Sequence, residues 1–359
     1  MCQDEVANVH RHLREGKSMA IITVGIDLAK NVFAVHGVDE TGKAMLIKPR
    51  VPRDQLATLI AQLPACLIGM EACSGAHHWA RMFQRHGHTV KLMAPNLVAP
   101  YRMSGKRGKN DAADAAAICE AVTRPSMRFV PLKDEHQQAT LCLHRTRQGF
   151  VEERTATYNR LRGLLWEFGV VLPQSPDKLR RYITEHLDTL PGWAKRSISD
   201  LLEHAGHIED RLLEYDRAIA EIAREDARSK RLMQLRGIGP TTASALLASI
   251  GAGHDFRNGR QVAAWIGLTP GQYSSGGKAR LGSITKAGDA YLRGLLVNGA
   301  RAVIANLGEK QDRFSRWART LVERRGYWRA AIAIAAKNAR LAWAVLKYGD
   351  DFKLEPVAD

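Results

Sequence analysis

The first part of the chain alternates short apolar runs with segments of helical spacing. Runs rich in β-branched residues predict strands over residues 21–27, 32–37, 44–47, 66–71 and 89–93, and helical spacing predicts helices over 54–63 and 77–85. Two of these strands end in an acid, Asp27 and Glu71. The order of elements is a three-strand meander followed by alternating helix and strand. It predicts an α/β domain in which the strand ends that carry the two acids are neighbours.

From residue 135 onward the pattern becomes almost wholly helical. Apolar residues fall at helical spacing over 135–167 and 207–226, with a shorter helical piece over 177–190. Plain packing of the two long helices is the favoured interpretation, and an antiparallel coiled-coil arm that joins two copies of the chain is the further suggestion. Another helical unit begins near Leu232.

We expect five segments along the 359 residues, which are enough for two or three domains with real cores. They are a polar extension over 1–18, the α/β domain over 19–131, a helical coiled-coil linker over 132–228, a mainly α-helical C-terminal domain over 229–348 and a tail over 349–359.

The charge balance narrows the class of partner. Lys and Arg number 53 against 37 Asp and Glu, and the formal net charge of +16 favours nucleic acid or an anionic membrane surface. We expect no membrane span, since the longest apolar candidate, residues 330–346, is interrupted by Lys337 and Arg340. The start of the chain does not resemble a secretory signal, and the five cysteines form no C-x-x-C pair. A cytoplasmic protein with reduced thiols is therefore expected.

Two further acids open an alanine-rich helical run. Asp111 and Asp114 share one helical face, which helix-start chemistry alone would explain, because carboxylates are favoured in the first turn. With Asp27 and Glu71 they make four acids on three separate elements. Such a set suits Mg²⁺ or Mn²⁺, and two such ions can activate an attacking oxygen and stabilise a leaving oxygen at phosphorus. Metal-dependent phosphoryl transfer is the favoured interpretation, with purely structural acids as the alternative.

Several basic and glycine positions are candidates for contacts with phosphate. A basic, glycine-containing loop precedes Asp111, and the Gly-Ile-Gly-Pro turn at 237–240 has the look of a helix-hairpin-helix turn. More cations flank a glycine-rich loop over 267–282. The candidate nucleic-acid-binding residues are Arg102, Lys106, Arg107, Lys109, Gly237, Gly239, Lys278, Arg280, Lys286 and Arg293. Each group taken alone is more typical of a solvated surface or an ordinary turn.

The C-terminal helices form a second basic region. Residues 301–347 hold eleven basic and three acidic side chains, so we expect this face to lie on nucleic acid. The three tryptophans of the region, Trp317, Trp328 and Trp343, are expected in the core rather than as stacking platforms.

The glycine-rich loop also contains two serines, Ser274 and Ser275. A serine hydroxyl is a poor nucleophile unless a base, a metal or cations activate it, and nearby cations could stabilise a pentavalent phosphorane. Ser-Ser-Gly-Gly is also ordinary loop sequence. The residues alone therefore favour an ordinary loop, with a nucleophilic serine as the alternative.

Five motifs in this order point to a known family. They read Gly-Ile-Asp-Leu-Ala-Lys at 25–30, Met-Glu-Ala-Cys-Ser-Gly-Ala-His-His at 70–78, Lys-Asn-Asp-Ala-Ala-Asp at 109–114, Gly-Ile-Gly-Pro at 237–240, and Gly-Leu-Thr-Pro through Ser-Gly-Gly to Thr-Lys-Ala-Gly-Asp over 267–289. The set resembles the DEDD-type transposases of the "one-ten" insertion-sequence family, which includes bridge-RNA-guided recombinases. Ser74 and Ala116 depart from the family pattern, at positions without an assigned role in chemistry.

The resemblance implies a RuvC-like (RNase H-like) N-terminal domain, a coiled-coil linker and a C-terminal transposase domain. It implies that the four acids bind Mg²⁺, with Mn²⁺ as a substitute, and that Ser275 rather than Ser274 is the DNA-attacking nucleophile. Strands would be cut through a covalent phosphoserine, exchanged and religated. The implied partners are the DNA of the element ends and target, a structured guide RNA (bridge RNA) and further copies of the chain in a dimer or tetramer. The expected location is the bacterial cytoplasm, in association with the nucleoid.

Two other functions stay open at this point. The first is a junction-resolving nuclease in which only the acids act and water attacks the phosphorus, which predicts no covalent protein–DNA adduct. The second is a non-catalytic nucleic-acid-binding protein whose acids are structural, which predicts no binding of Mg²⁺ or Mn²⁺ that depends on Glu71.

Overall fold

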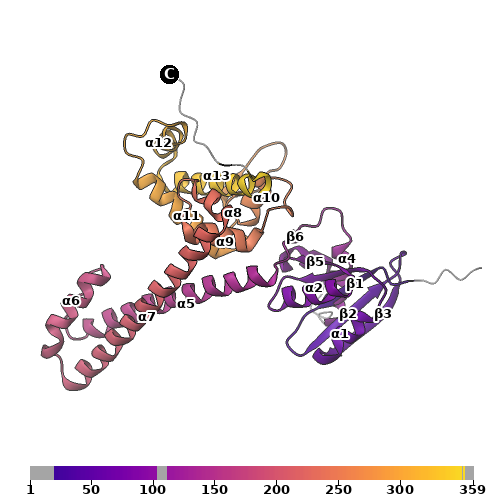
Figure 1. Ribbon diagram of the computed structural model, residues 1–359, viewed down its shortest axis with the longest axis horizontal. Helices are drawn as coiled ribbons and strands as arrows, with labels where there is room; N and C mark the ends of the chain where they lie inside the picture. The colour runs from indigo at the N-terminus through magenta and orange to yellow at the C-terminus, as the bar shows by residue number, and fades with distance from the viewer. Residues whose placement is uncertain (1–19, 103–110, 350, 352–359) are drawn as a thin grey trace, which may run out of the picture. The chain divides into compact units, whose positions relative to one another are not determined.

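The computed structural model describes residues 20–102, 111–349 and 351, and the chain divides into two compact units at Asp134–Glu135 (Figure 1). The first unit is mixed α/β, and the second is mostly helical. The predicted fold class is confirmed at this level, and the first unit is compatible with an RNase H-like domain. The division of the second unit into a linker and a C-terminal domain stays a prediction.

A six-stranded sheet forms the centre of the first unit, in the order β3-β2-β1-β4-β5-β6. Its strands are β1 Thr23–Asp27, β2 Val32–Val38, β3 Ala44–Pro52, β4 Leu67–Glu71, β5 Thr89–Met93 and β6 Phe129–Val130. The antiparallel meander of β1, β2 and β3 and the parallel pairs β1–β4 and β4–β5 confirm the predicted topology. The short β6, antiparallel to β5, was not predicted from the sequence.

Helices cover both faces of this sheet. They are α1 Arg53–Ala61, α2 Ala76–Arg85, α3 Pro95–Val98, the 3₁₀ turn Ala99–Tyr101 and α4 Asp111–Val122. Helices α1 and α2 contribute to one core with apolar strand residues such as Ile26 and Phe33. Helix α4 packs on the opposite face, where alternate residues of β1 and β4 point.

Two paired glycines bring α4 unusually close to the sheet. Gly25 of β1 and Gly69 of β4 lie side by side in the parallel register. A Cβ atom on Gly25 would lie 2.2 Å from the carbonyl oxygen of Ala115, and one on Gly69 would lie 2.8 Å from Cβ of Val122. Any larger residue at these two positions would therefore push α4 away from the strands.

The second unit combines two long helices with a helical core and a two-stranded hairpin. Its elements are α5 Glu135–Trp166, α6 Pro176–His186, the 3₁₀ turn Leu187–Thr189, α7 Gly192–Glu225, α8 Ala227–Met233, α9 Pro240–Ile250, α10 Gly259–Trp265, β7 Pro270–Gln272, β8 Leu281–Ile284, α11 Ala290–Ala305, α12 Arg313–Arg325 and α13 Tyr327–Tyr348. Helices α5 and α7 pack along each other, and α7 begins well before the predicted residue 207. A coiled-coil geometry for this pair stays a prediction.

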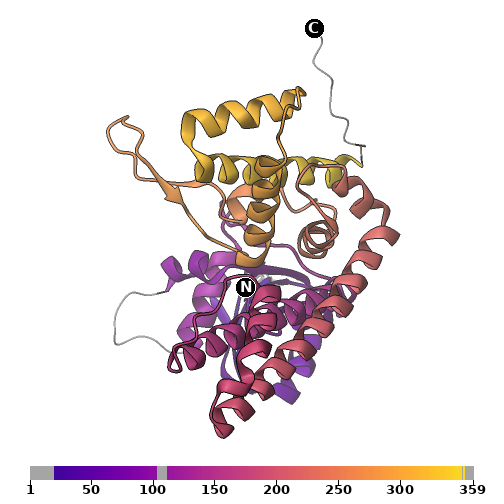
Figure 2. The same cartoon turned by 90° about the vertical axis from the view of Figure 1, so that its left-hand side faces the viewer.

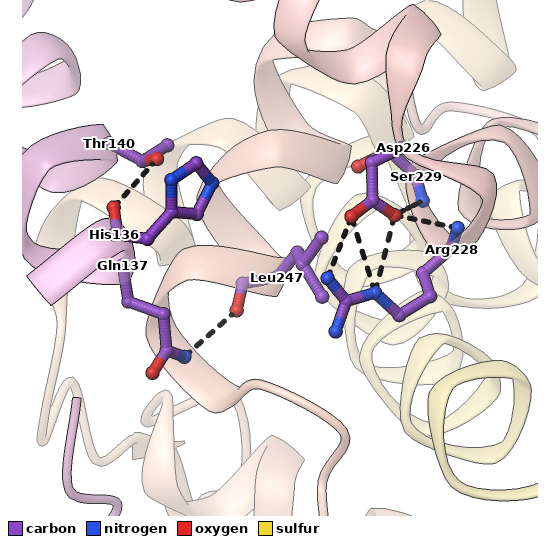
Figure 3. A network of polar contacts seen from close by, with 7 residues as sticks. All are labelled: His136, Gln137, Thr140, Asp226, Arg228, Ser229 and Leu247. Atoms are coloured by element: carbon purple, nitrogen blue, oxygen red, sulfur yellow. Dashed lines mark hydrogen bonds and ion pairs between the residues drawn. The ribbon is translucent and has the colours of Figure 1, made fainter. Parts of the chain in front are cut away.

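Polar contacts attach the long helices to the core of the second unit. The side chain of Gln137 in α5 donates a hydrogen bond to the carbonyl oxygen of Leu247 in α9, at 3.3 Å (Figure 3). Where α7 ends, Asp226 caps α8 by accepting hydrogen bonds from the backbone N–H groups of Arg228 and Ser229, at 2.7 and 3.1 Å (Figure 3). The first contact ties the start of α5 to the helical core, and the second fixes the turn from α7 into α8.

A buried histidine makes a further junction between α5 and this core. His144 is fully buried, with Nδ1 at 3.0 Å from the Tyr291 hydroxyl of α11 and Nε2 at 3.1 Å from the Ser244 hydroxyl of α9. Burial, and to a lesser extent the charge of Arg147, lowers the pKa of His144 to about 4. The imidazole is therefore neutral at physiological pH and serves as a hydrogen-bonding bridge.

Candidate functional site

The structure brings the strand-terminal acids together at one edge of the sheet. Asp27 is the last residue of β1 and Glu71 the last of β4. These strands are parallel neighbours with Ile26 opposite Met70, so both carboxylates reach the same edge. Asp111 and Asp114 stand in the first turn of α4, the helix that the paired glycines hold against the sheet.

An arginine lies among these carboxylates. The Nη2 atom of Arg102 lies 2.8 Å from Oε1 of Glu71, and its Nε atom lies 2.9 Å from Oδ1 of Asp114. The contact to Glu71 is an aligned hydrogen bond, whereas Nε has no hydrogen-bond partner of good geometry. The side chains of Glu71 and Asp114 are 13% and 12% exposed, so the guanidinium stands between two largely desolvated acids.

The electrostatics of the four acids are those of a crowded anionic site. Burial first, and then repulsion from Asp114, Glu71 and Asp111, raise the pKa of Asp27 to about 6. Burial also raises the pKa of Glu71, an effect opposed by Arg102 and reinforced by Asp114. Since repulsion from the other three acids reaches Asp27, the predicted set shares one electrostatic environment.

Hard oxygen donors that repel one another fit a divalent cation, which would remove the repulsion. Among the described residues, no three His, Cys, Asp or Glu side chains are already arranged as a metal site. Arg102 currently supplies the positive charge between Glu71 and Asp114. The donor set therefore fits Mg²⁺ or Mn²⁺ only if the Arg102 guanidinium moves aside, and the metal assignment stays a proposal.

The predicted basic loop is only partly described. Lys106, Arg107 and Lys109 lie outside the described residues. Arg102 lies within them, but its guanidinium contacts carboxylates, so a contact with phosphate would compete with these ion pairs. Nothing in the sequence signalled the pairing of Arg102 with the acids, because the residues involved come from three different elements.

The serine-containing loop is a β-hairpin, formed by β7 and β8. Near its tip, the Ser274 hydroxyl accepts hydrogen bonds from Nε2 of Gln272 and from the backbone N–H of Arg280, at 2.8 and 3.2 Å. Ser275 and Lys278 pair across the tip, and the backbone N–H of Lys278 donates to the carbonyl oxygen of Ser275 at 3.1 Å. The Ser275 hydroxyl has no hydrogen-bond partner among the described residues. The two serines thus differ: one braces the hairpin, and the other presents an exposed hydroxyl.

Four predicted cations surround the hairpin in different ways. Lys278 and Arg280 are exposed near its tip. Lys286 is exposed just after β8 and is the single non-glycine residue with positive φ in the described parts of the chain, at 54°. Arg293 donates hydrogen bonds to the carbonyl oxygens of Ile266 and Ala287, at 2.9 and 3.2 Å. Arg293 therefore supports the base of the hairpin, whereas the other three are open to solvent.

The predicted Gly-Ile-Gly-Pro turn joins α8 to α9. Gly237 has a φ of 83°, and a Cβ atom there would lie 2.7 Å from the carbonyl oxygen of Gly299 in α11, so internal packing already requires glycine. Gly239 is exposed and has open space around it. The resemblance to a helix-hairpin-helix turn and the phosphate contacts stay predictions, with Gly239 the more accessible of the two.

The tryptophans of the C-terminal helices are not all in the core. Trp343 is 7% exposed, as expected, and Trp317 is partly buried. For Trp328 the expectation was wrong, because this side chain is 62% exposed. It stands in the first turn of α13 beside the turn at Gly326, where little chain is available to cover it, and the Arg301 guanidinium lies 5.5 Å from its ring centre.

Comparisons with known proteins identify the family. A family model described as "Transposase IS116/IS110/IS902 family" matches residues 229–316, and a second, described as "Transposase" and built on the DEDD transposases of the IS110 type, matches residues 24–169. The chain is 45% identical to a probable family 20 transposase of Pseudomonas aeruginosa, over 91% of this chain and 97% of the relative. It is 36% identical to the transposase for insertion sequence element IS1111A of Coxiella burnetii, over 98% and 96% of the two chains.

These matches extend over both units of the structure and confirm the family resemblance of the five motifs. None of the described helices is long and apolar enough to span a bilayer. Transposases act on DNA, in agreement with the excess of positive charge. The chain is therefore an insertion-sequence transposase of the IS110 family.

Proposed function

We propose that this transposase cuts and rejoins DNA strands through a covalent phosphoserine at Ser275, with the acids of the first unit serving the same reaction. The observation that carries the proposal is the contrast between the serines: Ser274 is held by two hydrogen bonds, whereas the Ser275 hydroxyl is exposed and unpartnered in the described structure. A nucleophile must be free to approach its target, and of the two serines Ser275 meets this condition.

In the proposed step, the Ser275 hydroxyl oxygen forms a bond to a DNA phosphorus, and the bond from that phosphorus to a deoxyribose oxygen breaks. The serine proton ends on the departing oxygen, which becomes a free hydroxyl. Lys278 and Arg280, on the same hairpin, carry positive charge that would stabilise the pentavalent phosphorane. Attack by the hydroxyl of the exchanged strand reverses the step and releases the serine.

Asp27, Glu71, Asp111 and Asp114 would hold Mg²⁺, or Mn²⁺ in its place. When bound, such a cation supplies charge stabilisation at the phosphoryl oxygens and lowers the pKa of a coordinated hydroxyl. The protein's own contribution is to keep Glu71 and Asp114 largely desolvated and facing one another, with Arg102 neutralising them until a cation arrives. The reaction requires the serine to meet the acids of the same chain or of another copy in the assembly.

The remaining parts of the proposal rest on the family. Members of this family act as homo-oligomers guided by a structured bridge RNA, and we propose both for this chain. Purifying the protein from its host and sequencing any retained RNA tests the second directly. Recovery of a single RNA from the element's own non-coding end supports a guide, whereas recovery of only ribosomal and transfer RNA fragments contradicts it.

The covalent intermediate is tested on end-labelled DNA of the element junction, with products resolved on a denaturing protein gel. We expect a labelled protein band from the wild type and from Ser274→Ala, and none from Ser275→Ala. Excision should likewise be abolished by Ser275→Ala and by Asp27→Ala, while Ser274→Ala retains much of it. Full activity in Ser275→Ala would remove this residue as the nucleophile.

The same gel tests the alternative, a RuvC-like nuclease in which water attacks the phosphorus. That mechanism predicts cleaved DNA without any labelled protein band. Calorimetric titration with Mg²⁺ and Mn²⁺ tests the acids separately, because Glu71→Ala should lose binding only if the carboxylates form a metal site. Glu120→Ala is a matched control, since Glu120 is an exposed acid on α4 outside this cluster.

A further inference from the structure

A large groove lies beside the serine hairpin, within the second unit. It has a volume of about 1210 Å³ and runs between the β7–β8 hairpin on one side and helices α12 and α13 on the other. In Figure 2 the hairpin leaves the helical core next to these two helices. We call it the hairpin groove, defined by residues of β7, β8, α10, α12 and α13 and of the turns that flank β7 and β8.

The walls of the hairpin groove are mostly apolar. Trp317 and Leu321 of α12 face it, as do Trp328 and Ile332 of α13 and Leu281 of β8. Leu281 and Trp328 are 63% and 62% exposed, which is a large apolar surface for a soluble protein to leave in contact with water. A partner with flat or apolar groups would gain by covering it.

The charged residues of the hairpin groove are all positive. They are Arg260, Lys286, Arg325, Arg329 and Arg340, and each is exposed. No acidic side chain of the described residues lines the groove, and the sequence of α13 contains no acid. None of the five cations has an ion pair within the described residues. Burial, and after it repulsion from Arg340 and Arg313, lowers the pKa of Lys337 in α13.

We infer that the hairpin groove binds an unpaired stretch of DNA strand, with bases against the apolar walls and phosphates on the surrounding cations. A duplex would present its phosphates to the cations but would leave the tryptophan and leucine surfaces uncovered, because its bases are stacked inside. Unpaired bases expose flat faces that stack on aromatic side chains, and arginine pairs with phosphate through two N–H groups at once. The Arg301 guanidinium lies over one face of the Trp328 ring, 5.5 Å from its centre, and adds a further cation beside the groove.

The geometry of the hairpin places this strand close to the proposed nucleophile. Leu281 pairs with Gln272, and Ser275 pairs with Lys278, three residues further along each strand. At about 3.3 Å per strand residue, Ser275 stands on the order of 10 Å from the groove wall, roughly three base steps of 3.4 Å. This placement beside the cleaved phosphate rests on the proposed role of Ser275, whereas the binding itself does not.

The strained backbone at Lys286 agrees with this use. Its φ of 54° is disfavoured for a residue with a side chain, and the turn is held by hydrogen bonds from Lys286 N–H to Gly267 O at 3.1 Å and from Thr285 N–H to Thr269 O at 2.9 Å. Strain of this kind is retained where a side chain must be aimed. Here it directs the Lys286 side chain to the groove.

The test measures binding of fluorescently labelled DNA by the full-length protein at fixed salt, with a single strand of twelve thymidines and a duplex of equal length as probes. Trp328→Ala should weaken single-strand binding about tenfold and leave duplex binding within about twofold. Trp328→Phe, which keeps an aromatic face, should retain most of the affinity. Trp193→Ala is the matched control, since Trp193 is 85% exposed on α7, far along the chain from the groove.

Charge is tested by salt dependence. Arg329→Gln should reduce the slope of log Kd against log salt by about 0.7 for the single strand, the value for one phosphate contact. Equal single-strand affinity of Trp328→Ala and wild type would overturn the inference, as would an equal loss in Trp193→Ala. An acidic amphipathic peptide that displaces the single strand and binds more tightly would also overturn it, in favour of a protein partner. If Trp328→Ala binds the single strand weakly and Ser275→Ala is fully active, the inference about the hairpin groove stands and the proposed role of Ser275 as nucleophile is refuted.

Discussion

Replacing Gly25 by alanine tests how the fold positions the acids. The added Cβ atom would lie 2.2 Å from the carbonyl oxygen of Ala115 and 2.4 Å from the backbone nitrogen of Cys119. Both atoms belong to the backbone of α4, so no side-chain rotation relieves the overlap. Ordinary contact begins at 3.4 Å, and the helix must therefore withdraw by about 1.2 Å, the difference between these two distances.

The withdrawal affects both the stability of the fold and the positions of the acids. Overpacking of this kind costs ~1–3 kcal/mol of folding free energy, and backbone overlap places Gly25→Ala near the upper end. The same movement carries Asp111 and Asp114 away from Asp27 and Glu71, since α4 begins at Asp111. A misplacement of about 1 Å in a reacting group can cost on the order of 100-fold in rate. We therefore expect both to fall: stability by ~3 kcal/mol, and activity on the order of 100-fold, which corresponds to about 2.7 kcal/mol in the barrier.

The assay combines urea unfolding with DNA cleavage on the labelled junction substrate. Gly69→Ala should show the same effects more weakly, because its Cβ would meet the side chain of Val122 at 2.8 Å. The control is Gly149→Ala in α5, where nothing lies within 4 Å and the helix should gain ~0.5–1 kcal/mol with activity unchanged. If Gly25→Ala were as stable and as active as wild type, α4 could not lie against β1 as described.

Three further predictions concern other contacts. The pKa of His144 is about 4 in the folded protein, below the ordinary 6.5, so its contribution to stability is complete above pH 6.5 and falls by up to ~3 kcal/mol as the pH drops toward 4. When urea unfolding is measured at pH 7.5 and at pH 4.5, the free energy of unfolding of His144→Gln should therefore fall less between the two pH values than that of the wild type. An equal fall in both proteins would contradict this origin. Arg102→Gln should bind Mg²⁺ about tenfold more tightly, as measured by calorimetry, because the Arg102 guanidinium competes with the cation for Glu71. Unchanged affinity would argue against that competition. Asp312→Ala removes the N-terminal cap of α12 and also the ion-pair partner of Arg236, whose Nη1 atom lies 2.7 Å from the Asp312 carboxylate. It should lower the free energy of unfolding by ~2 kcal/mol in thermal unfolding, and Asp312→Asn should have a smaller effect. A loss below ~0.5 kcal/mol for Asp312→Ala would show that neither contact matters.

The sequence predicts the first unit well because its signals are local. Apolar β-branched runs end at Asp27 and Glu71, and parallel pairing of their strands brings the two ends to one edge, so the convergence of these acids follows from topology alone. Strand β5 has the predicted bounds, Thr89–Met93. The missed strand, β6, has only two residues and depends on its pairing with β5.

The second unit shows where local signals fail. Helix α7 starts at Gly192, directly after a proline, and it contains a second glycine at Gly206. These residues weaken the helical pattern in the first half of the helix. The hairpin of β7 and β8 looks like a loop in composition, because glycine and serine dominate it and its strands are short. Exposure of Trp328 and the pairing of Arg102 with two acids depend on tertiary contacts that no spacing encodes.

Arg293 braces the hairpin that carries Ser275 at its base, through the carbonyl oxygens of Ile266 and Ala287. Gly267 and Gly288 stand at this base, where a Cβ atom would lie 2.2 and 1.9 Å from backbone oxygens. At the tip, Gly276 and Gly277 have φ values of 56° and 76°, so a side chain there would strain the local backbone, but the space around them is open. Substitutions at the tip should therefore abolish catalysis while leaving the rest of the protein folded. A copy of the element with such a mutation would then still produce a folded but inactive transposase. This protein could bind the ends of intact copies of the element and so limit their spread through the genome.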